Sequence, residues 1–152
     1  MTAISNIKRG GFLDQTLDEA FPAVDAGLEP FGSLVLLQIK AAATRTKAGL
    51  ILNQATVETE ADNTRIAKVI AVGPLAFHSR DKQEPWPEGA WVRPGEYVRI
   101  PIYGGDRWRV LVSETKDARG EKVKVFAEFA LLEDLQLKGR VTGDPLAQLA
   151  FL

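Results

Sequence analysis

Short runs of large apolar residues, separated by turn-forming residues, recur through the middle of the chain. The run SLVLLQIK (33–40) is almost continuously apolar, which is typical of a strand buried on both faces. Further strands are predicted where β-branched and aromatic residues gather, at 65–73, 97–103, 108–113 and 122–129. Residues 130–135 (ALLEDL) fit either a turn of helix or a short strand. This pattern predicts an all-β fold, a small barrel or sandwich, over residues 31–135.

Glycine and proline mark the predicted turns. Gly73–Pro74 ends the strand 65–73. Pro94–Gly95 suits the centre of a type II turn, whose second central residue needs a positive φ. Pro101 cannot donate to a ladder, so it predicts a sheet edge or a bulge within 97–103. The polar stretch 114–121 is expected to be a hairpin loop.

The two ends of the chain differ from the middle. Residues 1–30 form an N-terminal extension in which apolar residues at helical spacing share one face (Leu13, Leu17 and Phe21). Either a short docking helix or a mobile arm fits this pattern. Residues 136–152 form a C-terminal tail that ends in LAQLAFL, which fits a docked helix or an interface strand.

Composition limits what the chain can do. A net charge of −1 gives no bulk attraction to nucleic acid or to an anionic membrane. No window of 18 apolar residues is present, so a spanning helix is not expected. The apolar pattern near the N-terminus is too broken for a secretory signal. The absence of cysteine removes disulfides and fits a reducing compartment, the cytoplasm.

Residues with catalytic or metal-binding chemistry are scarce. His78 is the one histidine, and without cysteine or a second imidazole it cannot complete a zinc site. The sequence contains no nucleophile–base set, P-loop or dinucleotide-binding glycine pattern. Glu58, Glu60 and Asp62 lack the spacing of a calcium loop, so a solvated segment is favoured there. We therefore expect no enzyme activity, no metal and no cofactor.

Two long connections carry the functional signal. The first joins 33–40 to 65–73 and contains Gly49, Leu50, Ile51 and Leu52, followed by thirteen residues of which Val57 is the only large apolar one. Such a polar stretch buries too little to offset its ordering entropy, so residues 50–65 are predicted to be mobile in the free protein. The aliphatic triplet fits either a small strand tucked against the barrel or an exposed segment that folds onto a partner.

The second connection, residues 74–96, is rich in proline and aromatic residues. It contains four prolines together with Phe77, Trp86 and Trp91. A long hairpin and a rigid irregular excursion both fit the sequence. A purely structural interpretation is that its aromatic residues cap one end of the barrel.

The order of these elements resembles the GroES-like co-chaperonins, the small lids of the large barrel-shaped chaperonins. SLVLLQIK resembles the family's first strand, and TKAGLILNQATVETEADNTRIAKVIAVGP resembles its mobile loop and the strand after it. VRPGEYVRI resembles the turn before a central strand, and ALLEDL resembles the closing segment. The match covers about residues 31–135 and rests on order and spacing. The extra segments, at 1–30, 114–121 and after 135, resemble enlarged versions known from bacterial viruses.

The resemblance implies a GroES-like β-barrel subunit of a ring, a heptamer, that caps a bacterial GroEL-type chaperonin in its nucleotide-bound state. The chain would act in the cytoplasm, or in the host cytoplasm if it is viral. Gly49, Leu50, Ile51 and Leu52 would be the chaperonin-binding residues of the mobile loop. Residues 74–96, with Phe77, Trp86 and Trp91, would form a roof loop over the folding cavity. The chaperonin hydrolyses ATP, and this chain would not.

Two alternatives belong to other classes. Zinc alcohol dehydrogenases contain a domain of the same fold, but they need cysteine and histidine ligands, and this chain has no cysteine and one histidine. A viral structural or decoration protein with a small β-barrel and docking arms shares the fold class and needs no chaperonin.

Overall fold

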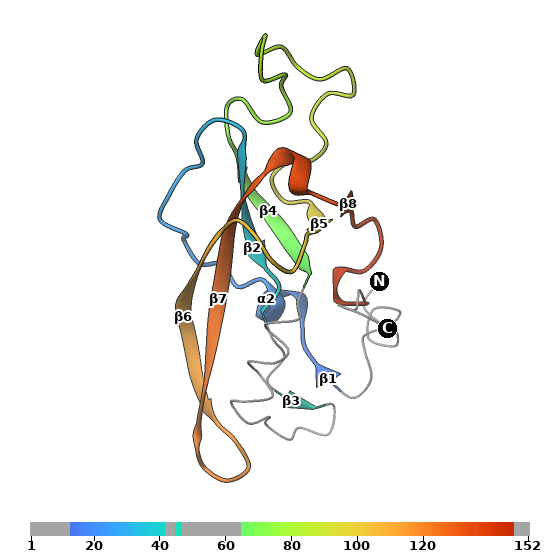
Figure 1. Cartoon of the computed structure of the whole chain (residues 1–152). Helices are drawn as coiled ribbons and strands as arrows, with labels where there is room; N and C mark the ends of the chain where they lie inside the picture. The colour runs from blue at the N-terminus through green and yellow to red at the C-terminus, as the bar shows by residue number, and fades with distance from the viewer. Residues whose placement is uncertain (1–12, 42–44, 47–64, 148–152) are drawn as a thin grey trace.

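A six-stranded antiparallel sheet forms the centre of the molecule. The computed structural model describes residues 13–41, 45–46 and 65–147 (Figure 1). The strands follow the order β6–β7–β2–β4–β5–β8. Their bounds are β2 (Leu34–Ile39), β4 (Ile66–Val72), β5 (Tyr97–Arg99), β6 (Asp106–Lys116), β7 (Lys122–Glu133) and β8 (Gly139–Arg140). Two further short strands, β1 (Leu13–Asp14) and β3 (Arg45–Thr46), pair with each other.

Helix is nearly absent from the described residues. It is confined to α2 (Leu17–Ala20) and to two 3₁₀ turns, η1 (Asp134–Gln136) and η2 (Pro145–Ala147). The predicted all-β fold class is therefore confirmed. Within the described part of the chain, no ladder joins the outer strands β6 and β8, so a closed barrel stays a prediction.

The predicted strands match the sheet best where it is buried. β2 and β4 lie within one residue of the predicted bounds, and Val35–Ile39 are all buried, as the continuous apolar run predicts. The predicted strand 97–103 is too long, since β5 ends at Arg99. Pro101 has no N–H to continue the ladder beyond this point.

The β6–β7 hairpin is longer than its apolar pattern predicts. Strands β6 and β7 are paired from Asp106, opposite Leu131, to Lys116, opposite Lys122. One bulge near Val112 shifts the register within this ladder. The polar hairpin loop therefore shrinks to the turn around Asp117 and Gly120. A solvated ladder can be built from polar residues, so hydrophobic runs understate its length. Both interpretations of 130–135 are partly correct, because β7 continues to Glu133 and η1 begins at Asp134.

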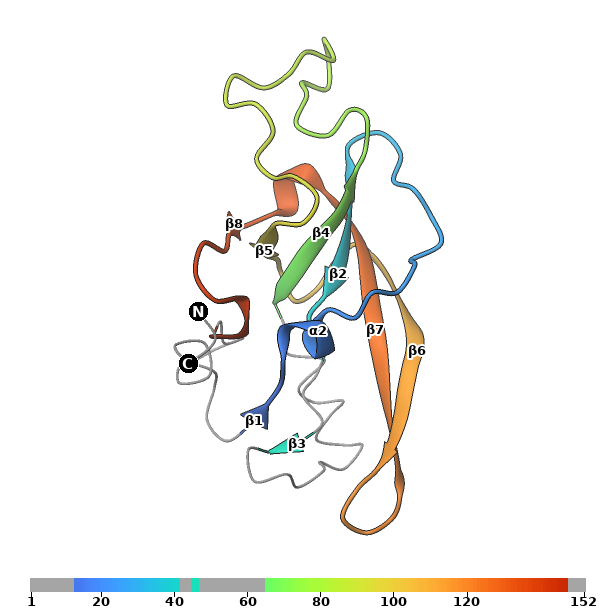
Figure 2. The same ribbon diagram turned by 180° about the vertical axis from the view of Figure 1, so that it is seen from behind.

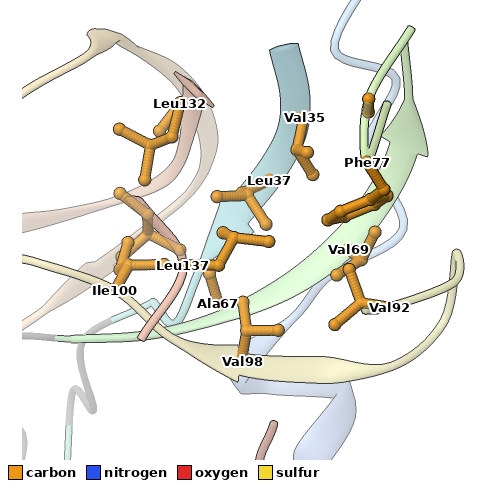
Figure 3. Close-up of a cluster of buried hydrophobic side chains, with 13 residues drawn as sticks. Val35, Leu37, Ala67, Val69, Phe77, Val92, Val98, Ile100, Leu132 and Leu137 are labelled. Atoms are coloured by element: carbon orange, nitrogen blue, oxygen red, sulfur yellow. The ribbon is translucent and has the colours of Figure 1, made fainter. Parts of the chain in front are cut away.

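The main hydrophobic core lies on one face of the sheet (Figure 3). Alternate residues of each strand point into it, as the period of a strand requires. Its buried members are Val35, Leu37, Ile39, Ala67, Val69, Ala76, Phe77, Val92, Val98, Ile100, Ala130, Leu132 and Leu137. Strands β7, β2, β4 and β5 all contribute residues to this cluster.

The opposite face is covered by residues 15–31, which we call the N-terminal strap. Seen from behind, the strap runs from α2 across the sheet and then up to the start of β2 (Figure 2). Val24 and Ala26 pack on Leu36, Ala127 and Phe129. The N-terminal strap is therefore docked on the sheet through these contacts.

Two glutamine side chains tie the strap to the sheet. Gln15 donates from Nε2 to the carbonyl of Ala41 (2.7 Å), and Gln38 donates from Nε2 to the carbonyl of Pro22 (2.8 Å). Thr16 begins α2 with a capping box to Glu19. Because α2 is a single turn, the predicted helical face does not form, and Leu17 remains 42% exposed.

The tail packs against the same end of the molecule as α2. β8 pairs with β5, and Leu146 joins Ala20, Phe21 and Ile66 in a small apolar cluster. Tyr97 packs against this cluster, and burial, with a smaller contribution from the Asp18 charge, raises its pKa. The tail up to residue 147 is thus part of the folded body, and the LAQLAFL end falls mainly outside the described residues.

Candidate functional site

Loop 74–96 is the largest irregular segment that the structure describes. It leaves the sheet after β4 and returns to β5, and it projects from one end of the sheet (Figure 1). Its only strand-like pairing is an isolated bridge between His78 and Pro85. Of the two structures that the sequence allowed, an irregular excursion is the one observed.

Close backbone packing fixes the departure of the loop from the sheet. Gly73 donates to the carbonyl of Leu34 (2.8 Å), and Leu75 donates to the carbonyl of Gly32 (2.9 Å). A Cβ atom at Gly73 would collide with the carbonyl oxygens of both Gly32 and Leu34. Glycine is therefore required where the loop begins.

The return of the loop uses the predicted type II turn. Glu96 donates from its backbone N–H to the carbonyl of Arg93 (3.1 Å), and Gly95 has φ of 96°. Pro94 and Gly95 thus occupy the two central positions, as the sequence predicts. A side-chain oxygen of Glu96 also accepts from the Arg93 N–H (2.7 Å), which closes the turn a second time.

The three aromatic residues of the loop form one cluster that faces the core. Phe77 is only 2% exposed, and Trp86 and Trp91 are half-buried against the main core. The ring centroids lie 5.6 Å apart for Phe77–Trp86, 6.1 Å for Phe77–Trp91 and 4.8 Å for Trp86–Trp91. These are favourable separations for aromatic pairs. The sequence-based expectation that they cap one end of the sheet is the geometry observed.

The outward surface of loop 74–96 carries charged residues and prolines, and no aromatic residue is fully exposed there. Leu75, at its base, is the one large apolar residue of this fully described loop that is exposed. The exposed side chains are charged residues, one glutamine, one alanine and prolines: Pro74, Arg80, Asp81, Lys82, Gln83, Glu84, Pro85, Pro87, Glu88, Ala90, Arg93 and Pro94. The loop thus turns its large aromatic side chains toward the core and its charged side chains to water.

A buried carboxylate at the end of β7 holds the loop. Asp134, the first residue of η1, is fully buried, and its Oδ2 accepts from the backbone N–H of Phe77 (2.7 Å). Arg80 donates to both oxygens, from Nη2 to Oδ1 (2.6 Å) and from Nη1 to Oδ2 (3.3 Å). A fork of this kind is a strong, charge-assisted contact. The hydrogen bond to Asp134 raises the pKa of Arg80.

No pattern in the sequence indicates this contact. Asp134 was recognisable only as an acid in a closing segment, and Arg80 reads as one charge among several in a polar loop. The two residues are 54 positions apart, so no local spacing pairs them. The sheet brings them together because the end of β7 lies beside the start of β2, where the loop also begins.

The remaining residues singled out in the sequence add no second site to the described part of the chain. Gly49, Leu50, Ile51 and Leu52 fall outside the described residues, as do Glu58, Glu60 and Asp62. His78 is half-buried, and its Nδ1 lies 2.7 Å from the carbonyl oxygen of Ala76. Among the described residues, no group of three His, Cys, Asp or Glu side chains could hold a metal ion. No helix in this part of the chain is long and apolar enough to cross a membrane.

Comparison of the chain with protein-family models, with curated proteins and with solved structures finds no match in any of the three. The described residues define a class, an all-β protein built on one antiparallel six-stranded sheet, with loop 74–96 projecting from one end of that sheet.

Proposed function

We propose that this chain is a co-chaperonin subunit, a non-catalytic lid that caps the ring of a GroEL-type chaperonin and encloses its protein-folding cavity. The observation that carries this proposal is the placement of two long connections at opposite ends of one sheet. Residues 40–65 connect the end of β2 to the start of β4, and loop 74–96 leaves from the other end of β4 (Figure 1).

The connection 40–65 is far longer than the fold requires. β2 and β4 are hydrogen-bonded antiparallel neighbours, with Ile39 opposite Ala67, and a two-residue turn can join such a pair. A long connection that the sheet does not need is usually functional. In this proposal Gly49, Leu50, Ile51 and Leu52 dock in an apolar groove of the chaperonin in its nucleotide-bound state.

The energetics of such a contact suit a reversible lid. Burial of three Leu or Ile side chains gives roughly 5–9 kcal/mol before other terms. Ordering of the segment costs about 1–2 kcal/mol for each residue fixed, which offsets most of this gain. One segment therefore binds weakly. A ring that presents several copies gains by avidity, by a factor of about 10²–10⁴, and still permits release.

The outer surface of loop 74–96 suits a roof over a folding cavity. Exposed apolar patches bind other apolar surfaces, including those of unfolded chains. A cover with its aromatic residues turned toward its own core presents little such surface. Phe77, Trp86 and Trp91 then serve to hold the roof rather than to contact a substrate.

Ring formation and barrel closure belong to the same proposal. The outer strands β6 and β8 leave sheet edges, and head-to-tail contact between neighbouring subunits covers such edges in a closed ring. We propose a heptamer on the strength of the family resemblance. Analytical ultracentrifugation of the chain alone should show an oligomer, and a stable monomer at micromolar concentration would count against the assignment.

A direct test is co-purification with a bacterial GroEL-type chaperonin. The tagged chain should retain the chaperonin in the presence of ATP and release it when nucleotide is removed. An equal signal with and without ATP would indicate non-specific capture. Assembly of the chain without any chaperonin binding would contradict the proposal and favour the second interpretation, a viral structural or decoration protein.

A further inference from the structure

Loop 74–96 has little regular structure of its own to keep it in one conformation. Beyond a few turn hydrogen bonds, its pairing is limited to the bridge between His78 and Pro85. Phe77 also adopts φ of 62°, a left-handed conformation that is unfavourable for a bulky residue. Such a conformation persists only where the surroundings determine it. Contacts from outside the loop must therefore fix it.

Asp134 supplies those contacts at the strained residue itself. Its carboxylate accepts the N–H of Phe77 and the guanidinium of Arg80, three residues farther along the loop. The backbone of Asp134 is itself held in place. Its N–H donates to the carbonyl of Ser33 (3.2 Å), and the N–H of Leu137, a core residue, donates to the Asp134 carbonyl (3.3 Å). One buried side chain thus joins two points of the loop to the sheet.

Arg80 completes the attachment from the solvent side. Its guanidinium also reaches Glu133 (3.2 Å) and the carbonyl of His78 (3.1 Å). Glu133 accepts in turn from the Ser33 hydroxyl (2.8 Å). The side chain of Arg80 is 48% exposed, so it can be replaced without opening the core.

We propose that Asp134 is a positioning residue that fixes loop 74–96 in a single conformation, and that Arg80 is the latch that closes on it. The loop then keeps one preorganised conformation in the free protein. A preorganised surface avoids ordering costs when it meets a partner. This inference goes beyond the lid function and holds whether or not the chain binds a chaperonin.

The tryptophans of the chain provide a readout specific to the loop. Of the three, Trp86 and Trp91 lie in the loop, whereas Trp108 lies on β6 and stacks on Phe129 at 5.9 Å. A Trp108→Phe background keeps an aromatic ring on Phe129 and leaves only the loop tryptophans. Acrylamide quenching then measures how often the loop opens, and near-UV circular dichroism reports the Trp86–Trp91 pair.

The decisive variants in this background are Arg80→Ala, Arg80→Lys and the matched control Lys82→Ala. Lys82 is an exposed cation of the same loop. Arg80→Ala should raise the quenching constant about two-fold and weaken the near-UV signal, because local opening becomes more populated. Arg80→Lys should fall between, since lysine keeps the charge but not the fork. Lys82→Ala should match the parent.

Two results would overturn the inference. One is an Arg80→Ala variant whose acrylamide quenching constant equals that of Lys82→Ala. The other is an Arg80→Ala variant whose melting temperature falls while its loop tryptophans stay protected from acrylamide in the folded state. That result is expected of a contact that stabilises the fold without positioning the loop. Asp134→Asn adds an independent arm, because it keeps an acceptor for Phe77 and removes the charge that Arg80 binds. It should reproduce the quenching of Arg80→Ala.

Discussion

The two long connections of the sheet differ in how their apolar residues are distributed. Loop 74–96 spreads three large aromatic residues along its length, and each of them reaches the core or its margin. Residues 40–65 place three large aliphatics in one triplet, Leu50 to Leu52, and follow it with a polar stretch in which Val57 is the only large apolar residue. Dispersed apolar residues, together with buried polar anchors, can hold a long loop against its ordering entropy. A single cluster is better suited to a partner.

The largest expected effect comes from removing the aromatic anchor of loop 74–96. Phe77→Ala should destabilise the protein by about 3–5 kcal/mol, because the fully buried ring leaves a cavity between the loop and the core. Chemical denaturation followed by far-UV circular dichroism measures this loss. A change below about 1 kcal/mol, the size of an ordinary surface substitution, would show that the loop is not held through this ring.

Proteolysis sharpens the comparison between the two connections. A Glu-specific protease can cut after Glu58 or Glu60 in one connection and after Glu88 in the other. We expect the first cuts at Glu58 and Glu60, because the polar stretch has little to bury and Glu88 lies in the anchored loop. Mass spectrometry of timed samples identifies the order. Protection of residues 53–64 in the absence of a partner would contradict the prediction of mobility.

A smaller effect should follow from the turn that returns loop 74–96 to the sheet. Gly95→Ala should destabilise by about 1–2 kcal/mol, because Gly95 has positive φ and a Cβ there meets no neighbour, so the change isolates backbone strain. Gly139→Ala is the matched control, since its Cβ also meets nothing and its φ is not positive. Equal melting temperatures for the two variants would rule out the type II turn as an anchor.

Residue patterns predicted the parts of the fold in which burial and local conformation act together. β2 was predictable because residues buried on both faces form a continuous apolar run, and the turn at Pro94–Gly95 because one residue there needs positive φ. The aromatic cap of loop 74–96 was also predictable in kind. Each of these features is determined by neighbouring residues in the chain.

Features that depend on contacts between distant segments could not be predicted. The Arg80–Asp134 contact joins two charged residues 54 positions apart, which no local spacing pairs. The strap is held by amide side chains such as Gln15 and Gln38, whose partners are backbone carbonyls that any residue could supply. In the outer half of the β6–β7 hairpin, residues 114–116 of β6 are polar and give no hydrophobic signal, although their partners in β7 include the buried Val123.

In the proposed lid, the triplet Leu50–Leu52 binds a partner and is not part of the core. Ile51→Asp tests this most directly, with Leu28→Asp as the control, because Leu28 is a 38% exposed aliphatic residue of the N-terminal strap, outside both connections and both outer strands. We expect Ile51→Asp to abolish ATP-dependent chaperonin binding without changing the melting temperature, and Leu28→Asp to keep binding. A large drop in the melting temperature of Ile51→Asp would contradict the proposed role of the triplet, because an unpaired charge destabilises a protein strongly only where it is buried.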